Sequence, residues 1–350
     1  MTQCVEINGR RVGAGCSVYI VAEMSANHGH NFQEAVQIIE AAKLAGADAV
    51  KLQTYTPETL TIDCDNEYFR IRGTIWDGRT LYDLYGEACT PWDWQPRLKE
   101  RANKLGLDFF STPFDETAVD FLEDMGVPAY KVASFENVDL PLLKRIAGTC
   151  KPIIMSTGMA TLSEVDEAVR TIRESGNSQL ALLKCTSAYP APPEEINLST
   201  IPHLAETFSV PVGLSDHTLG IAVPVAGVAL GACIIEKHLT LARVGGGPDS
   251  AFSLEPHEFT AMVEAIRTVE KALGSVRYGV TDQEFSSRVL RRSLFVVKDV
   301  KAGELFTEEN VRSIRPGHGL HTRHLDEVIG RCSRRDMKCG TPLTWSVVRW

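Results

Sequence analysis

The sequence predicts an α/β protein, a (β/α)8 TIM barrel followed by a small C-terminal β-rich domain. Eight short, continuously apolar runs recur between residues 18 and 238, and such runs are typical of parallel strands buried on both faces. Each run ends on polar side chains, which is expected where the βα loops of a barrel form an active site. This pattern indicates an enzyme before any single motif is considered.

The predicted strands and helices alternate along the first 274 residues. The strands are expected at 18–23, 49–53, 107–112, 129–134, 152–157, 180–186, 211–217 and 233–238. Apolar residues at helical spacing predict helices at 32–45, 92–105, 117–125, 162–175, 221–230 and 256–273. Residues 63–86, rich in Tyr, Trp and Arg, interrupt this rhythm. We expect this insertion to be a lid or a subunit contact on the catalytic face.

The length of 350 residues leaves room for two domains. We expect a barrel domain at 1–274, which opens with a hairpin turning at Asn8-Gly9. A polar linker at 275–292 and a small β-rich domain at 293–350 are expected to follow. The last domain contains strand-like runs at 294–297 and 343–348.

Composition narrows the classes of partner. A net charge of −9 at pH 7 makes nucleic acid and anionic membranes poor partners. The sequence has neither a signal peptide nor an apolar run of about 18 residues, so we expect a cytoplasmic protein that does not enter a membrane. The nine cysteines lack metal-binding spacing and are interpreted as reduced thiols.

Two histidines, His217 and His238, end the last two predicted strands. Neighbouring strand ends meet at one rim of a barrel, and neutral imidazole is a good ligand for a divalent ion. We therefore predict a metal site with two protein ligands and open positions for water and substrate. The alternative is a pair of hydrogen-bonded core histidines.

Lys51 and Lys131 end two other predicted strands, and three interpretations of them stay open. They could bind a phosphate or carboxylate together with nearby hydroxyls, form a Schiff base as in aldolases, or pair with Glu23 or Glu136. Glu23 is a candidate general base or orienting group. Asp249 follows a glycine-rich stretch that either delivers it to a polar substrate or is a simple turn.

Taken together, these motifs resemble the sialic acid synthase family over essentially the whole chain. The matching segments are AEMSANH at 22–28, KLQT at 51–54, STPFD at 111–115, STGM at 156–159, GLSDHT at 213–218 and EKH at 236–238. In the tail, RSL at 292–294 and IRPG at 314–317 resemble the family's antifreeze-like (SAF) domain.

The resemblance implies a condensation of phosphoenolpyruvate with a linear amino-sugar aldehyde, which releases phosphate. It implies Glu23, His217 and His238 as catalytic residues, with the two histidines holding a divalent metal, typically manganese and otherwise magnesium or cobalt. Phosphoenolpyruvate would be bound by Lys51, Thr112, Lys131, Ser134, Ser156, Ser187 and Ser215. The sugar would be bound by Gln53, Tyr189, Asp249 and Arg315. Arg315 would come from the SAF domain of the partner in a homodimer.

Two positions favour one branch of the family. Phe135 and Ser187 stand where neuraminate-forming members commonly have glycine and asparagine. These departures resemble the branch that makes pseudaminate from 2,4-diacetamido-2,4,6-trideoxy-L-altrose, and Phe135 and Ala188 suit a more apolar pocket. Synthesis of neuraminate or legionaminate from an N-acylmannosamine-type sugar is the alternative, followed by a Schiff-base aldolase.

Overall fold

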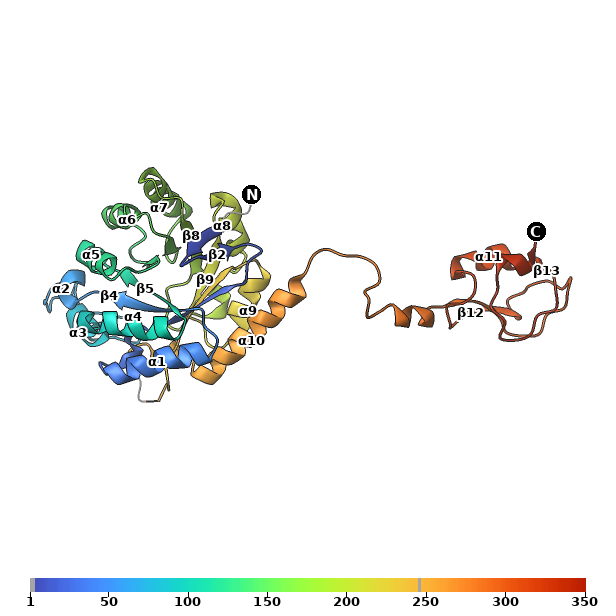
Figure 1. Cartoon of the computed structure of the whole chain (residues 1–350), viewed down its shortest axis with the longest axis horizontal. Coiled ribbons are helices and arrows are strands. Elements are labelled where there is room, and N and C mark those ends of the chain that lie inside the picture. The colour runs from blue at the N-terminus through green and yellow to red at the C-terminus, as the bar shows by residue number, and fades with distance from the viewer. Residues whose placement is uncertain (1–3, 245–246) are drawn as a thin grey trace. The chain divides into compact units, whose positions relative to one another are not determined.

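The computed structural model describes residues 4–244 and 247–350 and divides the chain into two compact units, Met1–Gly274 and Ser275–Trp350 (Figure 1). The first unit is a closed barrel of eight parallel strands in the order β10-β3-β4-β5-β6-β7-β8-β9. The predicted (β/α)8 class is therefore confirmed. Among the described residues, no helix has the length and apolar character needed to cross a membrane.

The barrel strands coincide with the eight apolar runs. They are β3 Tyr19–Glu23, β4 Ala49–Thr54, β5 Asp108–Pro113, β6 Tyr130–Val132, β7 Ile153–Ser156, β8 Leu180–Cys185, β9 Val212–Asp216 and β10 Ile234–His238. Every residue of β3, β7, β9 and β10 is buried. Their apolar side chains pack alternately inside the barrel and against the surrounding helices, which is why the runs are continuous rather than alternating.

The helices lie outside the barrel. They are α1 Phe32–Leu44, α4 Gln95–Lys104, α5 Glu116–Asp124, α6 Leu140–Ala147, α7 Leu162–Glu174, α8 Thr200–Phe208, α9 Ala222–Ala229 and α10 Pro256–Leu273. The sequence did not predict α6 and α8. Both carry a proline near the start, Pro141 and Pro202, and proline is tolerated in the first turn because that turn needs no backbone donor.

The insertion between β4 and β5 is an ordered segment. It contains two short helices, α2 Pro57–Leu60 and α3 Leu81–Ala88. Between them the chain doubles back, with backbone hydrogen bonds from Ile71 N to Arg79 O (2.9 Å) and from Gly78 N to Ile71 O (3.0 Å). The tip of this turn carries Trp76.

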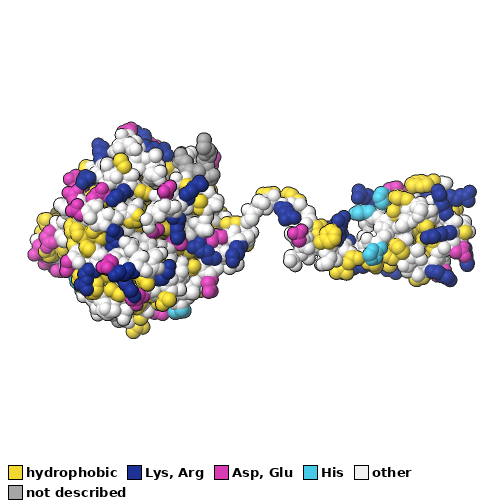
Figure 2. Space-filling model, viewed as in Figure 1, with side chains coloured by type: hydrophobic (Ala, Val, Ile, Leu, Met, Phe, Trp, Pro, Cys, Tyr) yellow, Lys and Arg dark blue, Asp and Glu magenta, His cyan; other side chains and the backbone are white. Residues whose placement is uncertain are grey.

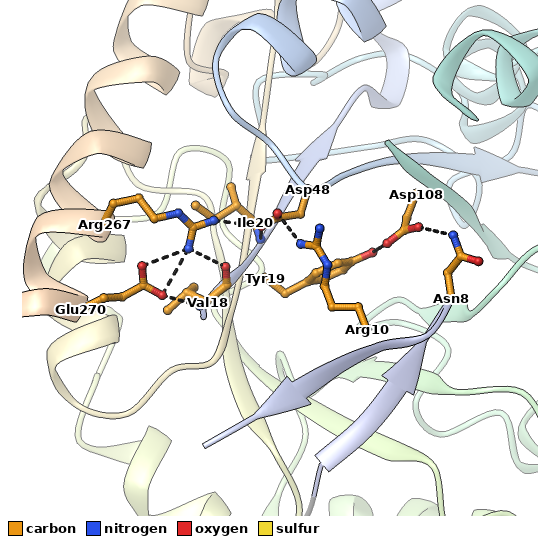
Figure 3. A network of polar contacts seen from close by, with 9 residues as sticks. All are labelled: Asn8, Arg10, Val18, Tyr19, Ile20, Asp48, Asp108, Arg267 and Glu270. Carbon is orange, nitrogen blue, oxygen red and sulfur yellow. Dashed lines mark hydrogen bonds and ion pairs between the residues drawn. The ribbon is translucent and has the colours of Figure 1, made fainter. Parts of the chain in front are cut away.

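A hairpin of β1 Cys4–Ile7 and β2 Arg10–Gly13 closes the N-terminal end of the barrel, as the Asn8-Gly9 turn predicted. Its apolar side chains pack among residues that fill the barrel interior. Figure 3 shows the polar contacts around it. Asn8 Nδ2 and the hydroxyl of Tyr19 both donate to the Asp108 carboxylate (2.8 Å each), and Arg10 pairs with Asp48. The chemistry must therefore lie at the opposite, C-terminal end of the barrel.

The C-terminal unit has its own small core. Strand β11 Ser293–Val296 pairs with β12 Val311–Ile314, and β13 Cys332–Ser333 pairs with β14 Val348–Arg349. A four-residue helix, α11 Leu325–Val328, lies between β12 and β13. The end of the predicted linker packs on this unit, because Gly317 N donates to Val289 O (2.7 Å).

The prediction of a strand at residues 343–348 was wrong. Residues Trp345–Val347 form a 3-10 turn, and only the last residue of the run enters β14. Leu343, Val347 and Val348 are apolar because they fill the core of the small unit. Burial without extended pairing explains the misleading pattern.

Candidate active site

A cavity of about 410 Å³ opens at the C-terminal ends of the barrel strands. Eleven of the fourteen site residues that the sequence singled out line it: Glu23, Lys51, Gln53, Lys131, Ser134, Ser156, Tyr189, Ser215, His217, His238 and Asp249. Of the other three, Thr112 and Ser187 lie just behind the lining. Arg315 follows β12 in the C-terminal unit. The alternation of side chains along each strand brings these residues together, although they are far apart in the sequence.

The two histidines lie side by side, with ring centroids 5.3 Å apart. The Nδ1 of His217 lies 3.0 Å from the backbone oxygen of Thr186, so in the neutral ring the proton is on Nδ1 and the lone pair is on Nε2. Burial opposes the charge on His217, but the neighbouring Cys185 raises its pKa. The Nδ1 of His238 is buried and has no hydrogen-bond partner among the described residues. Burial lowers the pKa of His238 well below its usual value, so this ring is neutral. An unpartnered neutral imidazole beside a second one fits a divalent cation.

Lys51 lies between two carboxylates. Its Nζ is 2.9 Å from Glu23 and 3.7 Å from Glu236, and it donates to Thr112 Oγ1 at 3.4 Å. Burial opposes the charge on Lys51, but the two carboxylates raise its pKa. The ion pair with Glu23 that the sequence left open is therefore present, and Lys51 is a cation at neutral pH.

Lys131 has a different environment. Its Nζ donates to Ser156 Oγ (2.6 Å) and to Val132 O (2.7 Å), and burial lowers its pKa. The pKa of Glu236 is lowered despite burial, because Lys51 and Lys131 both lie near it. The floor of the cavity thus holds two lysines against two carboxylates. Lys131 uses two of its three donors within the protein and has one left for an anionic ligand.

Serine hydroxyls form a narrow cradle beside Lys131. Gly158 N donates to Ser134 Oγ (3.1 Å). A Cβ at residue 158 would lie 2.4 Å from Ser187 Oγ and 2.6 Å from Ser134 Oγ. Glycine is therefore the residue that lets both hydroxyls approach this backbone amide. Hydroxyls and an amide beside a lysine suit a phosphate or carboxylate group.

Gln53 connects the polar residues on the sugar-binding side. Its Nε2 donates to Glu23 Oε1 (2.9 Å) and to Ser25 Oγ (2.8 Å), and Ser25 in turn hydrogen-bonds to Asp249. Asp249 lies in a turn and lines the cavity; its contact with a polar substrate stays a prediction. Residues 245 and 246 of the glycine-rich stretch before it lie outside the described residues.

The cavity also contains two residues to which the sequence gave no catalytic role. Burial raises the pKa of Glu136 to about 7, and its Oε2 has no hydrogen-bond partner among the described residues. Burial would raise the pKa of Cys185, but the nearby His217 ring lowers it to about 7. The signal in the sequence was their position at or just after the ends of predicted strands.

Apolar residues of the insertion form one side of the cavity. They are Leu60, Ile71, Trp76, Leu81, Leu84 and Ala88, and we call them the apolar wall. Phe114 and Phe135 continue it from the βα loops. The insertion therefore belongs to the site, in agreement with its predicted position on the catalytic face.

Comparison with known proteins identifies relatives of both domains. Residues 38–278 match the NeuB family and residues 291–349 match the SAF domain. The pseudaminic acid synthase of Campylobacter jejuni (strain NCTC 11168) is 46% identical over 93% of this chain and 95% of its own. The N,N'-diacetyllegionaminic acid synthase of Legionella pneumophila is 38% identical, with 97% of each chain covered.

A solved structure shares the architecture at lower identity. The N-acetylneuraminic acid synthetase of Leptospira borgpetersenii superposes with a TM-score of 0.73 at 32% identity, over 82% of this chain and 95% of that one. The motif resemblance, the barrel, the C-terminal domain and these relatives all agree. The chain therefore belongs to the NeuB family.

Proposed function

We propose that this protein is a pseudaminic acid synthase, which condenses phosphoenolpyruvate with 2,4-diacetamido-2,4,6-trideoxy-L-altrose and water to give pseudaminate and phosphate. The observation that carries the proposal is the 46% identity to a pseudaminic acid synthase over nearly the whole chain, against 38% for a legionaminate-forming relative. Phe135 and Ser187, which depart from the neuraminate-forming pattern, support the same branch.

The reaction balances without a further reactant. The C3 carbon of phosphoenolpyruvate bonds to the aldehyde carbon, the oxygen of water bonds to C2, and the bond from C2 to the phosphate oxygen breaks. The water oxygen becomes the keto oxygen at C2 and gives up both of its protons, one to the aldehyde oxygen and one to the departing phosphate. The enzyme must therefore bind an anion, orient an aldehyde and handle a proton.

The anion-binding role belongs to the floor of the cavity. We assign phosphoenolpyruvate to Lys51 and Lys131 with the hydroxyls of Thr112, Ser134, Ser156, Ser187 and Ser215. The lysines stabilise the phosphate charge electrostatically. The cradle at Gly158 supports this assignment, because its hydroxyls and amide all lie within a few ångströms of one point.

Glu23 and Glu136 are assigned two different roles, orientation of the reactants and proton transfer. Glu23 is held by Lys51 and Gln53, so we assign it to orienting the reactants. Glu136 has a pKa of about 7 and an oxygen with no hydrogen-bond partner in the described part of the chain, so it can take up or release a proton at neutral pH. Gln53, Tyr189 and Asp249 are assigned to the sugar.

We also propose that His217 and His238 hold a divalent metal, with manganese expected first and magnesium or cobalt as alternatives. The support is that the buried Nδ1 of His238 has no hydrogen-bond partner within residues 4–244 and 247–350, and that the His217 ring lies beside it. A bound divalent cation would supply Lewis-acid polarisation of the aldehyde oxygen. Both histidines line the cavity, with ring centroids 5.3 Å apart.

A homodimer, with Arg315 reaching the partner's site, completes the proposal. The charge distribution supports it: residues 275–350 contain 14 Lys and Arg against 9 Asp and Glu, whereas residues 1–274 contain 22 against 36. Figure 2 shows basic side chains over much of the visible face of the C-terminal unit. A basic domain and an acidic barrel attract one another.

The test is phosphate release from phosphoenolpyruvate, with manganese, in parallel reactions with the diacetamido-trideoxy-altrose and with N-acetylmannosamine. Release with the altrose sugar alone, abolished by EDTA and restored by manganese, is the expected result. Release with N-acetylmannosamine alone would overturn the sugar assignment. Two results together would favour a Schiff-base aldolase: activity that persists in EDTA, and a covalent adduct of the substrate on Lys51 or Lys131 after borohydride reduction.

A further inference from the structure

The cavity has two chemically different sides. The charged and hydroxyl-bearing residues come from the strand ends of the barrel, whereas the apolar wall comes from the insertion between β4 and β5. Of the nine residues between β4 and β5 that line the cavity, three carry hydroxyls, namely Tyr55, Thr74 and Tyr85. A bound substrate must therefore present a polar side and an apolar side at once.

Trp76 connects the apolar wall to the opposite side of the cavity. Its indole Nε1 donates to the backbone oxygen of Pro248 (3.3 Å), and its ring centroid lies 5.7 Å from that of Tyr189. Pro248 directly precedes Asp249, and the Tyr189 ring lies 4.5 Å from that of His217. Trp76 thus contacts the segments that carry two of the residues assigned to the sugar.

The chemistry of the condensation orients the sugar between these sides. The aldehyde carbon must lie beside the enol carbon of phosphoenolpyruvate, over the lysines and serines of the floor. The far end of the open chain, C6, is then directed away from the floor. In the altrose substrate C6 is a methyl group, whereas in N-acetylmannosamine it carries a hydroxyl.

We infer that Trp76 is a specificity-determining residue whose indole face receives the deoxy end of the sugar. This inference rests on the proposed function and extends it to the orientation of the substrate. The indole N–H is already donated to Pro248, so the ring offers the substrate only an apolar face. A methyl group gains by leaving water there, whereas a hydroxyl loses hydrogen bonds that nothing on that face replaces.

We expect Trp76 to contribute moderately to the ratio of kcat/KM between the altrose sugar and N-acetylmannosamine. An apolar pocket rejects an added hydroxyl by a factor on the order of 100 at most. Trp76→Ala is therefore expected to lower kcat/KM for the altrose sugar about tenfold or more and to lower that for N-acetylmannosamine less, so that the preference narrows. Trp76→Phe, which keeps an apolar ring and loses the N–H, is expected to retain most of the preference.

The experiment measures kcat/KM for both sugars with the full-length wild type, both Trp76 variants and Tyr68→Ala. Tyr68 lies in the same insertion but is 81% exposed and does not line the cavity, so its variant should keep the wild-type ratio. The inference would be overturned if Trp76→Ala lowered kcat/KM equally for both sugars, or if Trp76→Phe were as impaired as Trp76→Ala. Either result would show that Trp76 only holds the insertion against the Pro248 segment. If the wild type used only N-acetylmannosamine, the proposed function would be overturned instead. The wild-type rates with both sugars are therefore measured before any variant is made.

Discussion

At the scale of single residues, the protonation of Glu136 makes the stability of the protein depend on pH. Burial raises its pKa from 4.5 to about 7, so the folded protein binds this proton more tightly than the unfolded chain does. The resulting stability is fully present below about pH 4.5 and is lost as the pH rises through about 7. Glu136→Gln should therefore stabilise the protein at pH 8 relative to the wild type and have little effect near pH 4.5.

Thermal unfolding of both proteins between pH 4.5 and pH 8 checks this expectation. Each kcal/mol shifts the Tm by roughly 2–4 °C in a protein of about 150–250 residues, and by less in this chain of 350. Glu167→Gln, on the exposed face of α7, serves as the control and should show no such trend. A difference between Glu136→Gln and the wild type that is constant with pH would contradict the buried, titrating carboxylate.

Gly158 provides a second prediction at this scale. A methyl group at this position would overlap the hydroxyls of Ser134 and Ser187, and displacing such groups by about 1 Å can cost on the order of 100-fold in rate. Gly158→Ala should therefore raise the KM for phosphoenolpyruvate and lower kcat/KM by tenfold to a hundredfold. Steady-state kinetics with varied phosphoenolpyruvate measure the change.

The matched control for this substitution is Gly148→Ala. A Cβ there would lie no closer than 3.4 Å to its neighbours, and its kinetics should match those of the wild type. If Gly158→Ala also had wild-type kinetics, the cradle of Ser134 and Ser187 would not be the anion site.

At the scale of elements, an ion pair behind the histidines holds β9 and β10 together. Asp216 and Lys237 are paired in register, and both side chains are fully buried. The Lys237 ammonium bonds to the Asp216 carboxylate and to Thr218 O, which are the residues on either side of His217. Since Lys237 precedes His238, the pair fixes the backbone beneath both imidazoles.

Breaking this pair from one side should be costly. Lys237→Met leaves the Asp216 charge buried and should destabilise the protein by about 3–5 kcal/mol. The double variant Asp216→Asn/Lys237→Met removes both charges and should recover much of that loss. Urea denaturation measures both, with Lys298→Met, in the exposed pair with Glu309, as a control that should not change. A double variant less stable than Lys237→Met would contradict the argument.

At the scale of the whole molecule, the proposed dimer predicts that Arg315 acts on the partner's barrel. Arg315→Ala and His238→Ala should each be nearly inactive alone. When the two are mixed and allowed to exchange subunits, about a quarter of the wild-type activity should return, because half of the dimers then contain one intact site of two. No recovery despite proven exchange would show that Arg315 acts on its own barrel or on none.

The sequence by itself determined the class of fold and eleven of the polar residues that line the cavity. Eight apolar runs with polar ends specified a parallel barrel, because strands buried on both faces cannot alternate. The end of a strand is a local property, so Lys51, Lys131, His217 and His238 could be assigned to one rim without coordinates. Only β6 is markedly shorter than its run.

The tertiary structure decided what depends on contacts between distant segments. The burial that raises the pKa of Glu136, the cradle between Ser134 and Ser187, and the ion pair of Lys51 with Glu23 all depend on packing between segments that are distant in the sequence. The insertion offered no strong pattern, so its apolar wall and the contact from Trp76 to Pro248 emerged only from the fold. Periodicity records which side of an element is buried, whereas distance, burial and charge between elements are set by packing.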